Sequence, residues 1–205
     1  MTFFYRFVKT VATPLVKLMI RYKRVGVEHI PKQGGLILCC NHTSMIDIAA
    51  LVITCPRMIR FMAKEELFRN PLLGWFFRHM GGFPIARGKG DTEAMKRAEE
   101  IVREGGILGI FPEGTRTKDA TGHPAKGKAG AAMIASATGA DVLPACIRYA
   151  GFDGKVHLLH TTHVHFGSVI PNDQLRIEEN DRAQIRKASE TIMGTITQMW
   201  EDINV

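Results

Sequence analysis

The stretch Leu36-Ile37-Leu38-Cys39-Cys40-Asn41-His42-Thr43-Ser44-Met45-Ile46-Asp47 decides the fold of this 205-residue chain. Its first five residues are apolar without interruption, which is typical of a strand buried on both faces of a sheet. Ser44 and Asp47 have the spacing of a capping box, so a helix is expected to begin near Ser44 and to continue to Thr54. His42 and Asp47 therefore lie in a short connection between two buried segments.

The pair formed by His42 and Asp47 has two interpretations at this point. A neutral imidazole can take a proton from a hydroxyl group, and a carboxylate on its other ring nitrogen would hold the required tautomer. A strand-to-helix turn allows the two side chains to meet. Alternatively, Asp47 is only the capping acid and His42 is a loop histidine whose hydrogen bonds are satisfied. On this motif alone, the second interpretation is favoured.

Short apolar runs and helical periodicity alternate along the rest of the chain. Strands are expected over 25–30, 58–63, 83–85, 107–111, 142–149 and 156–166. Helices are expected over 71–80, 91–104, 129–138 and 181–200. This alternation predicts an α/β fold with a mixed, largely parallel central sheet that helices cover. No repeat or linker interrupts residues 25–205, so this range is expected to be one domain.

Residues 1–24 differ in character from the rest of the chain. The spacing predicts an amphipathic helix over 2–22, which Pro14 is expected to bend or to divide in two. The apolar face holds Phe3, Phe7, Val11, Leu15, Leu18 and Tyr22. The segment has six basic residues and no acidic one: Arg6, Lys9, Lys17, Arg21, Lys23 and Arg24. This composition suits a helix that docks on a membrane surface, and it also suits a helix that packs on its own domain.

The net charge of +7 indicates anionic partners. No recognised nucleic-acid-binding motif or pattern of stacking aromatics accompanies the basic residues, so no nucleic-acid partner is expected. No apolar run reaches the roughly 18 residues of a transmembrane helix, and no secretory signal is recognised.

The cysteines and histidines are the other candidates for reactive or metal-binding groups. The four cysteines lie in or beside apolar runs without a Cys-x-x-Cys pair, which predicts buried thiols in a reducing compartment: Cys39, Cys40, Cys55 and Cys146. Four histidines gather in one short stretch: His157, His160, His163 and His165. Because no acid or cysteine joins them and their spacing follows no zinc pattern, an exposed histidine-rich strand is expected and no metal site.

Three glycine-containing stretches are candidates for binding an anion. Phe111-Pro112-Glu113-Gly114-Thr115-Arg116 ends a buried strand, and its arginine offers a planar fork suited to phosphate. Phe83-Pro84-Ile85-Ala86-Arg87-Gly88-Lys89-Gly90 precedes a helix and could cradle a phosphate. Gly122-His123-Pro124-Ala125-Lys126-Gly127-Lys128-Ala129 resembles a P-loop but lacks the last hydroxyl residue, so a nucleotide hydrolase is disfavoured. The alternative for each is an ordinary solvated turn.

The motifs follow one another in a specific order. This order is His42-x4-Asp47, Phe83-Pro84-Ile85-x-Arg87-Gly88, Phe111-Pro112-Glu113-Gly114-Thr115-Arg116 and Val142-Leu143-Pro144-Ala145-Cys146-Ile147. It resembles the four sequence blocks of the glycerolipid acyltransferase family. Residues 61–74 strengthen the similarity to the bacterial 1-acylglycerol-3-phosphate (lysophosphatidate) acyltransferases. The resemblance covers residues 25 to 147.

The resemblance implies a role for each matching residue. His42 would be the catalytic base and Asp47 its partner. The phosphate of the acceptor would be held by Arg87, Glu113, Gly114, Thr115 and Arg116, with Lys126 and Lys128 as further substrate-binding candidates. From its chemistry alone, Glu113 is expected to orient an arginine or to accept a bond from a substrate hydroxyl. Many relatives carry Asp before the second-block arginine, whereas this chain has Ala86.

The implied reaction is transfer of an acyl group from acyl-CoA or acyl carrier protein to the sn-2 hydroxyl of lysophosphatidate, without a metal or cofactor. Because such substrates lie in the bilayer surface, the protein is expected on the cytoplasmic face of the cell membrane. It would dock there on anionic lipid through residues 1–24 without spanning the bilayer. The alternatives are another lysolipid or hydroxyl acceptor, or a non-catalytic binder of lipid phosphates.

Overall fold

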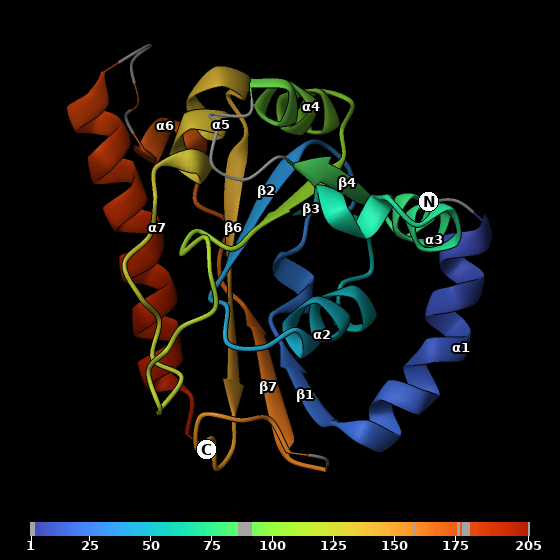
Figure 1. Cartoon of the computed structure of the whole chain (residues 1–205). Coiled ribbons are helices and arrows are strands. Elements are labelled where there is room, and N and C mark those ends of the chain that lie inside the picture. The colour runs from blue at the N-terminus through green and yellow to red at the C-terminus, as the bar shows by residue number, and fades with distance from the viewer. Residues whose placement is uncertain (1–2, 86–91, 158, 176, 178–180, 205) are drawn as a thin grey trace.

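The computed structural model describes residues 3–85, 92–157, 159–175, 177 and 181–204. They form a single α/β domain around a sheet of seven strands (Figure 1). The strands are β1 (Arg21–Val25), β2 (Leu36–Cys40), β3 (Ile59–Lys64), β4 (Gly82–Ile85), β5 (Ile107–Ile110), β6 (Asp141–Tyr149) and β7 (Thr161–Phe166). The α-helices are α1 (Phe3–Met19), α2 (Ile46–Thr54), α3 (Pro71–His79), α4 (Thr92–Arg103), α5 (Gly130–Thr138), α6 (Asn172–Leu175) and α7 (Arg182–Asp202).

The sheet has the strand order β1-β7-β6-β2-β5-β3-β4. Every neighbouring pair is parallel except β6 and β7, which are antiparallel. The predicted mixed and largely parallel sheet is therefore confirmed. β2 lies near the middle, between β5 and β6, so residues that follow it lie above the carboxyl ends of parallel strands. Ligands of open α/β sheets bind at such ends.

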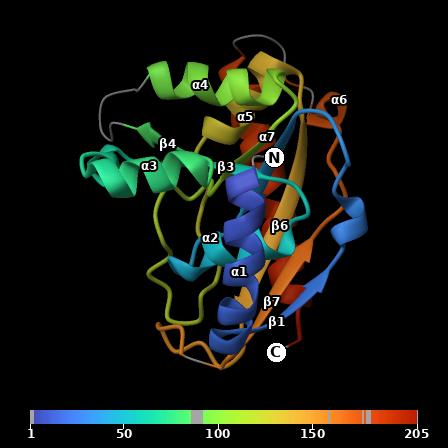
Figure 2. The same ribbon diagram turned by 90° about the vertical axis from the view of Figure 1, so that its right-hand side faces the viewer.

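Both faces of β2 are buried, as its uninterrupted apolar run predicts. Leu36, Leu38 and Cys40 belong to the core on the α1 and α2 side of the sheet. Ile37 and Cys39 belong to the core that α4, α5 and α7 cover. Because successive side chains of a strand point to opposite faces, one strand supplies both cores. Figures 1 and 2 show the two helical layers on either side of the sheet.

The first strand lies earlier in the chain than expected. The prediction placed a strand over 25–30, whereas β1 ends at Val25 and a 3₁₀ turn follows at Val27–His29. Gly26 between them has φ 75°, and a Cβ there would lie 1.9 Å from the carbonyl oxygen of Phe166. Only glycine fits so close to another backbone. The predicted helix over 2–22 correspondingly ends at Met19, and α1 is continuous through Pro14.

The expected exposed histidine strand is also wrong. β7 begins only at Thr161 and lies between β1 and β6 inside the sheet. His163 is buried, and burial, followed by the charge of Lys23, lowers the pKa of its imidazole. His157 and His160 lie before the strand, in the preceding loop. Among the described residues, no three His, Cys, Asp or Glu side chains come together as metal ligands.

α1 is partly integrated into the domain. Tyr5 is fully buried in the core, and Lys9 donates a hydrogen bond to the carbonyl oxygen of Cys55. A row of apolar side chains on the opposite side of the helix is exposed: Phe3, Phe7, Val11, Leu15 and Leu18. The helices within the described ranges are each too short or too polar to cross a bilayer. The helix thus has one packed face and one unpacked apolar face.

Candidate active site

Asn41 fixes the start of the turn that follows β2. Its side-chain Oδ1 accepts a hydrogen bond from the backbone N–H of Ile147, and its Nδ2 donates to the carbonyl oxygen of the same residue, both at 2.8 Å. Asn41 is buried, and its side-chain amide makes the pair of hydrogen bonds to β6 that the backbone of a further strand residue would make. This role was not predicted, because the partner lies 106 residues further along the chain.

The turn brings His42 and Asp47 together. Nδ1 of His42 lies 2.8 Å from Oδ2 of Asp47, whose side chain is fully buried. The same Oδ2 accepts hydrogen bonds from the backbone N–H groups of Thr43 at 2.7 Å and of Ser44 at 2.8 Å. Because the carboxylate accepts the proton on Nδ1, the lone pair of the neutral imidazole lies on Nε2.

Only half of the predicted capping box is formed. The Asp47 carboxylate binds the N–H of Ser44, as a capping-box acid should. The Ser44 hydroxyl, however, accepts a 3.3 Å hydrogen bond from Ile46, and the N-cap of α2 is Met45. The helix therefore begins at Ile46, two residues later than expected. Asp47 accordingly both satisfies the backbone and contacts His42.

Tyr149, at the end of β6, is a third member of this group. Its phenol hydroxyl donates a 2.5 Å hydrogen bond to Oδ1 of Asp47. Burial, followed by the negative charge of Asp47, raises the pKa of Tyr149 far above its usual range, so the phenol remains a donor. The sequence analysis did not identify it. Its only signal is a polar tip at the end of a strand that is otherwise buried.

The loop after β5 holds His42 from the other side. The imidazole stacks on the ring of Phe111, with 4.0 Å between centroids and an interplanar angle of 16°. Oε1 of Glu113 accepts a hydrogen bond from the backbone N–H of His42 at 2.8 Å. The carbonyl oxygen of His42 accepts one from the N–H of Thr117 at 2.7 Å. The side chain of His42 is 13% exposed, so access to it remains.

Glu113 is buried, unlike most residues of a turn. Burial raises the pKa of its carboxyl group, and the N–H groups of His42 and Ala125 counter this shift. Oε2 has no hydrogen-bond partner within the described part of the chain. The structure thus places this carboxylate against the backbone of His42, whereas the residue chemistry predicted a contact with an arginine or with substrate.

The remaining predicted substrate-binding residues lie around the same turn. Gly114, Thr115 and Arg116 are exposed directly after Glu113. Lys128 approaches them, since a Cβ on Gly114 would lie 2.9 Å from its Nζ, and its backbone N–H donates to the carbonyl oxygen of Pro112 at 2.8 Å. Lys126 is exposed nearby in sequence. Arg87 lies outside the described residues.

The cysteines have no access to this site as nucleophiles. All four are free and buried, and burial raises the pKa of each thiol. The prediction of buried, unpaired thiols is confirmed. A thiolate nucleophile needs a lowered pKa and exposure. The chemistry that the arrangement supports is therefore proton transfer at Nε2 of His42.

Comparison with known proteins shows the family of this chain. Residues 21–148 match the family model described as Acyltransferase. The chain is 32% identical over 142 residues to 1-acyl-sn-glycerol-3-phosphate acyltransferase of Bacillus subtilis, an alignment that covers 69% of each protein. It is 33% identical over 183 residues to the protein of that name from Borreliella burgdorferi, covering 86% of this chain and 67% of the relative.

Two further relatives extend the comparison. Lyso-ornithine lipid O-acyltransferase of Pseudomonas aeruginosa is 34% identical over 122 residues, which cover 58% of this chain and 45% of that protein. The crystal structure of the 1-acyl-sn-glycerophosphate acyltransferase of Thermotoga maritima superposes with a TM-score of 0.75. That superposition covers 98% of this chain and 81% of the other at 23% identity, and so shows a shared fold. From the family match and the curated relatives, the chain belongs to the acyltransferase family.

Proposed function

We propose that this protein transfers an acyl group from a thioester donor to the sn-2 hydroxyl of lysophosphatidate, giving phosphatidate. The observation that carries the proposal is the buried Asp47 carboxylate at 2.8 Å from Nδ1 of His42. This arrangement directs the free lone pair of the imidazole outward from a turn at the carboxyl end of the sheet. The names of the relatives from Bacillus subtilis and Borreliella burgdorferi support the choice of acceptor.

In the proposed mechanism, Nε2 of His42 removes the proton from the acceptor hydroxyl as its oxygen attacks the thioester carbonyl. Asp47 stabilises the imidazolium that forms and keeps the ring in its orientation. The tetrahedral intermediate then collapses with cleavage of the carbon–sulfur bond. The thiol of coenzyme A or of the carrier protein leaves with the proton that His42 had accepted. No covalent acyl-enzyme forms.

The acceptor phosphate is assigned to the exposed turn after Glu113. Arg116 offers a fork that matches two phosphate oxygens, and Lys128 lies next to Gly114 in the same region. Thr115 and Arg87 complete the proposed set by resemblance to the family. Glu113 contributes differently, because its Oε1 is occupied by the backbone of His42. Its part is to hold the base in place.

Residues 1–24 are proposed to dock the protein on anionic lipid at the cytoplasmic face of the membrane. The support is the exposed apolar row of α1, where Phe3 is 86% and Leu18 is 71% exposed. α3 extends this surface: its Leu72 and Trp75 are exposed, and the rings of Phe4 in α1 and Trp75 are 4.8 Å apart. Figures 1 and 2 show α3 close to the N-terminal end of α1. Basic residues flank the row, as an interfacial helix requires.

Thiol release from acyl-CoA, measured with and without lysophosphatidate in mixed micelles, tests the proposal. Release that depends on the acceptor is the expected result, and a lipid-phosphate binder would release no thiol. A second acceptor class follows from the relative named for lyso-ornithine lipid. Parallel assays with a lysolipid that lacks the phosphate distinguish the two, because faster release with that lysolipid would contradict the choice of lysophosphatidate.

A further inference from the structure

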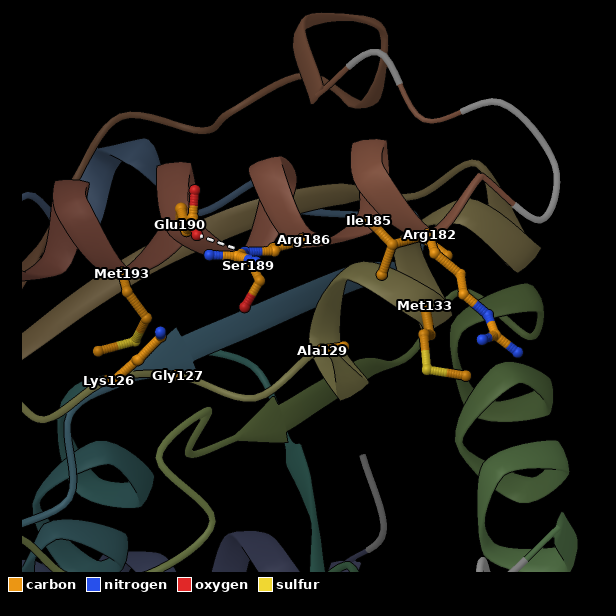
Figure 3. A pocket seen from close by; sticks show the side chains of 10 residues that line it. All are labelled: Lys126, Gly127, Ala129, Met133, Arg182, Ile185, Arg186, Ser189, Glu190 and Met193. Carbon is orange, nitrogen blue, oxygen red and sulfur yellow. Dashed lines mark hydrogen bonds and ion pairs between the residues drawn. The ribbon is translucent and has the colours of Figure 1, made fainter.

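A cavity of about 810 Å³ lies between α5, α7 and the segment Lys126–Ala129 (Figure 3). Its volume falls in the range of small-molecule sites. Apolar and basic side chains line it. The apolar side chains are Met133, Ile185 and Met193, and the basic ones are Lys126, Arg182 and Arg186. Neither His42 nor Asp47 lines it, so it is distinct from the site of proton transfer.

The charge in this cavity is unbalanced. Its single acid, Glu190, pairs with Arg186, with 3.0 Å between Oε1 and Nε. Within the ranges that the structure describes, Lys126 and Arg182 have no acidic partner. Arg182 also begins α7, at the positive end of the helix dipole, where cations are unfavourable. The side chain of Asp181 caps this helix end by accepting hydrogen bonds from the N–H groups of Ala183 and Gln184. An anionic group in the cavity would supply an acidic partner for Lys126 and Arg182.

The cavity shares a wall with the catalytic loop. A Cβ on Gly127 would lie 2.4 Å from Cγ of Met193, so this segment packs directly against α7. The Ser189 hydroxyl donates to the carbonyl oxygen of Lys128 at 3.1 Å, which fixes the segment from the α7 side. From the other side, Lys128 binds the carbonyl oxygen of Pro112, next to the residue that holds His42. The segment that lines the cavity is therefore linked through hydrogen bonds to the turn that holds His42.

We propose that this cavity binds the phosphate end of the phosphopantetheine arm of the acyl donor. The assignment rests on the proposed function and deepens it. In the acceptor, the phosphate is carried by the carbon next to the one that bears the reacting hydroxyl group. The acceptor phosphate must therefore lie beside His42. The donor phosphate, in contrast, is separated from the thioester by the whole pantetheine arm. That arm has apolar and amide parts, which suit a cavity lined by methionine, isoleucine and basic side chains.

The test is the double variant Lys126→Glu/Arg182→Glu of the full chain, assayed with each substrate varied in turn. We expect the donor KM to rise about tenfold, the size that two weak surface charge pairs give together. The kcat and the acceptor KM should stay unchanged. The matched control is Lys187→Glu/Lys96→Glu, which reverses two exposed lysines outside the cavity. Titration of the protein with coenzyme A by calorimetry gives a second readout that needs no turnover.

Two donors separate the possible sources of the phosphate. A rise in KM with both acyl-CoA and acyl carrier protein supports a site for the shared arm, and a rise with acyl-CoA alone supports coenzyme A as the donor. A rise with the carrier alone means that the cations contact the carrier surface, and it overturns the assignment. An unchanged donor KM, or a raised acceptor KM, also overturns it. If wild-type protein releases no thiol, the proposed function fails. Weaker binding of coenzyme A by the variant would still support the cavity as its binding site, and equal binding would overturn that assignment.

Discussion

The phenol of Tyr149 donates a 2.5 Å hydrogen bond to Oδ1 of Asp47, while Oδ2 of the same carboxylate binds Nδ1 of His42. Both oxygens of the Asp47 carboxylate are therefore held. Tyr149, which binds Oδ1, lies 102 residues away in the chain, and His42, which binds Oδ2, lies five residues away. The buried carboxylate has its hydrogen bonds satisfied without an arginine or lysine partner. Its remaining negative charge is available to the imidazole.

Tyr149→Phe should lower the rate of the reaction. Without the phenol donor, the Asp47 carboxylate is held in place by one group fewer and orients the His42 imidazole less firmly. We expect kcat to fall about tenfold. The free energy of unfolding should drop by about 1–3 kcal/mol, because one carboxylate oxygen loses its partner.

Tyr5→Phe is the matched control for Tyr149→Phe, since Tyr5 is also buried but its phenol bonds to the backbone of Ile59. This variant should leave kcat unchanged. If Tyr149→Phe lowers stability alone, with the kcat of wild type, Tyr149 has only a structural part.

His42→Ala should lower the rate of thiol release by about 10²–10⁴-fold, the usual contribution of a general base. The fold should remain intact, because Asp47 keeps its backbone and Tyr149 partners. Circular dichroism and thermal unfolding check this point. His157→Ala, at an exposed loop histidine, is the control. A His42→Ala protein that retains a large share of activity would rule out the proposed base.

Glu113→Gln tests whether this residue positions His42 or binds substrate as a carboxylate. Gln keeps an oxygen that can accept from the His42 N–H, whereas Ala does not. We therefore expect Glu113→Gln to retain much more activity than Glu113→Ala in the thiol-release assay. Equal loss in both variants would favour direct contact between the carboxylate and substrate.

The stability of the protein should also depend on Glu113 and pH. Burial raises the pKa of this carboxyl group above its unfolded value. The folded state thus binds more protons than the unfolded state between the two values, and its stability falls as pH rises through the folded pKa. Urea unfolding from pH 4 to 7 should show this fall in wild type and less of it in Glu113→Gln. If the free energy of unfolding changes with pH equally in wild type and Glu113→Gln, the raised pKa of Glu113 is contradicted.

Arg116→Ala should raise the acceptor KM about tenfold and change the donor KM little, because a lost phosphate contact weakens binding of the phosphorylated acceptor. Initial rates with varied lysophosphatidate measure this effect. Lys118→Ala removes an exposed charge from the same loop and serves as the control. An unchanged acceptor KM with an unchanged rate would exclude Arg116 from the phosphate site.

Replacing the exposed apolar row of α1 should release the protein from membranes. Phe7→Ser/Leu15→Ser/Leu18→Ser keeps the packed face with Tyr5 and is expected to weaken binding to anionic vesicles by about a hundredfold. Deletion of the segment is a poorer test, because Tyr5 lies in the core and β1 pairs with β7. Sedimentation with vesicles gives the readout.

Met133→Ser replaces an exposed residue of α5, on the opposite face of the sheet from α1, and is the control for this variant. Both proteins should unfold at similar urea concentrations. Vesicle binding by the triple variant equal to that of wild type would contradict docking through this face.

The sequence by itself determined the elements around the site. The apolar run Leu36–Cys40 and the following helical pattern predict β2 and α2, because local periodicity reports which faces are buried. The order of the motifs led to the acyltransferase family, and the family match bears this out. Local patterns were less reliable where one residue ends an element, as Gly26 ends β1.

Only the tertiary structure decided how the site is held and what surrounds it. Asn41 and Asp47 find partners on β6, more than 100 residues away, and Glu113 finds the backbone of His42 across two neighbouring strands. The burial of His163 likewise follows from the position of β7 between two other strands. Such contacts depend on strand order, which periodicity does not specify. The sequence thus predicted His42 and Asp47 as a pair, and the packing of β2 beside β5 and β6 supplied the groups that orient them.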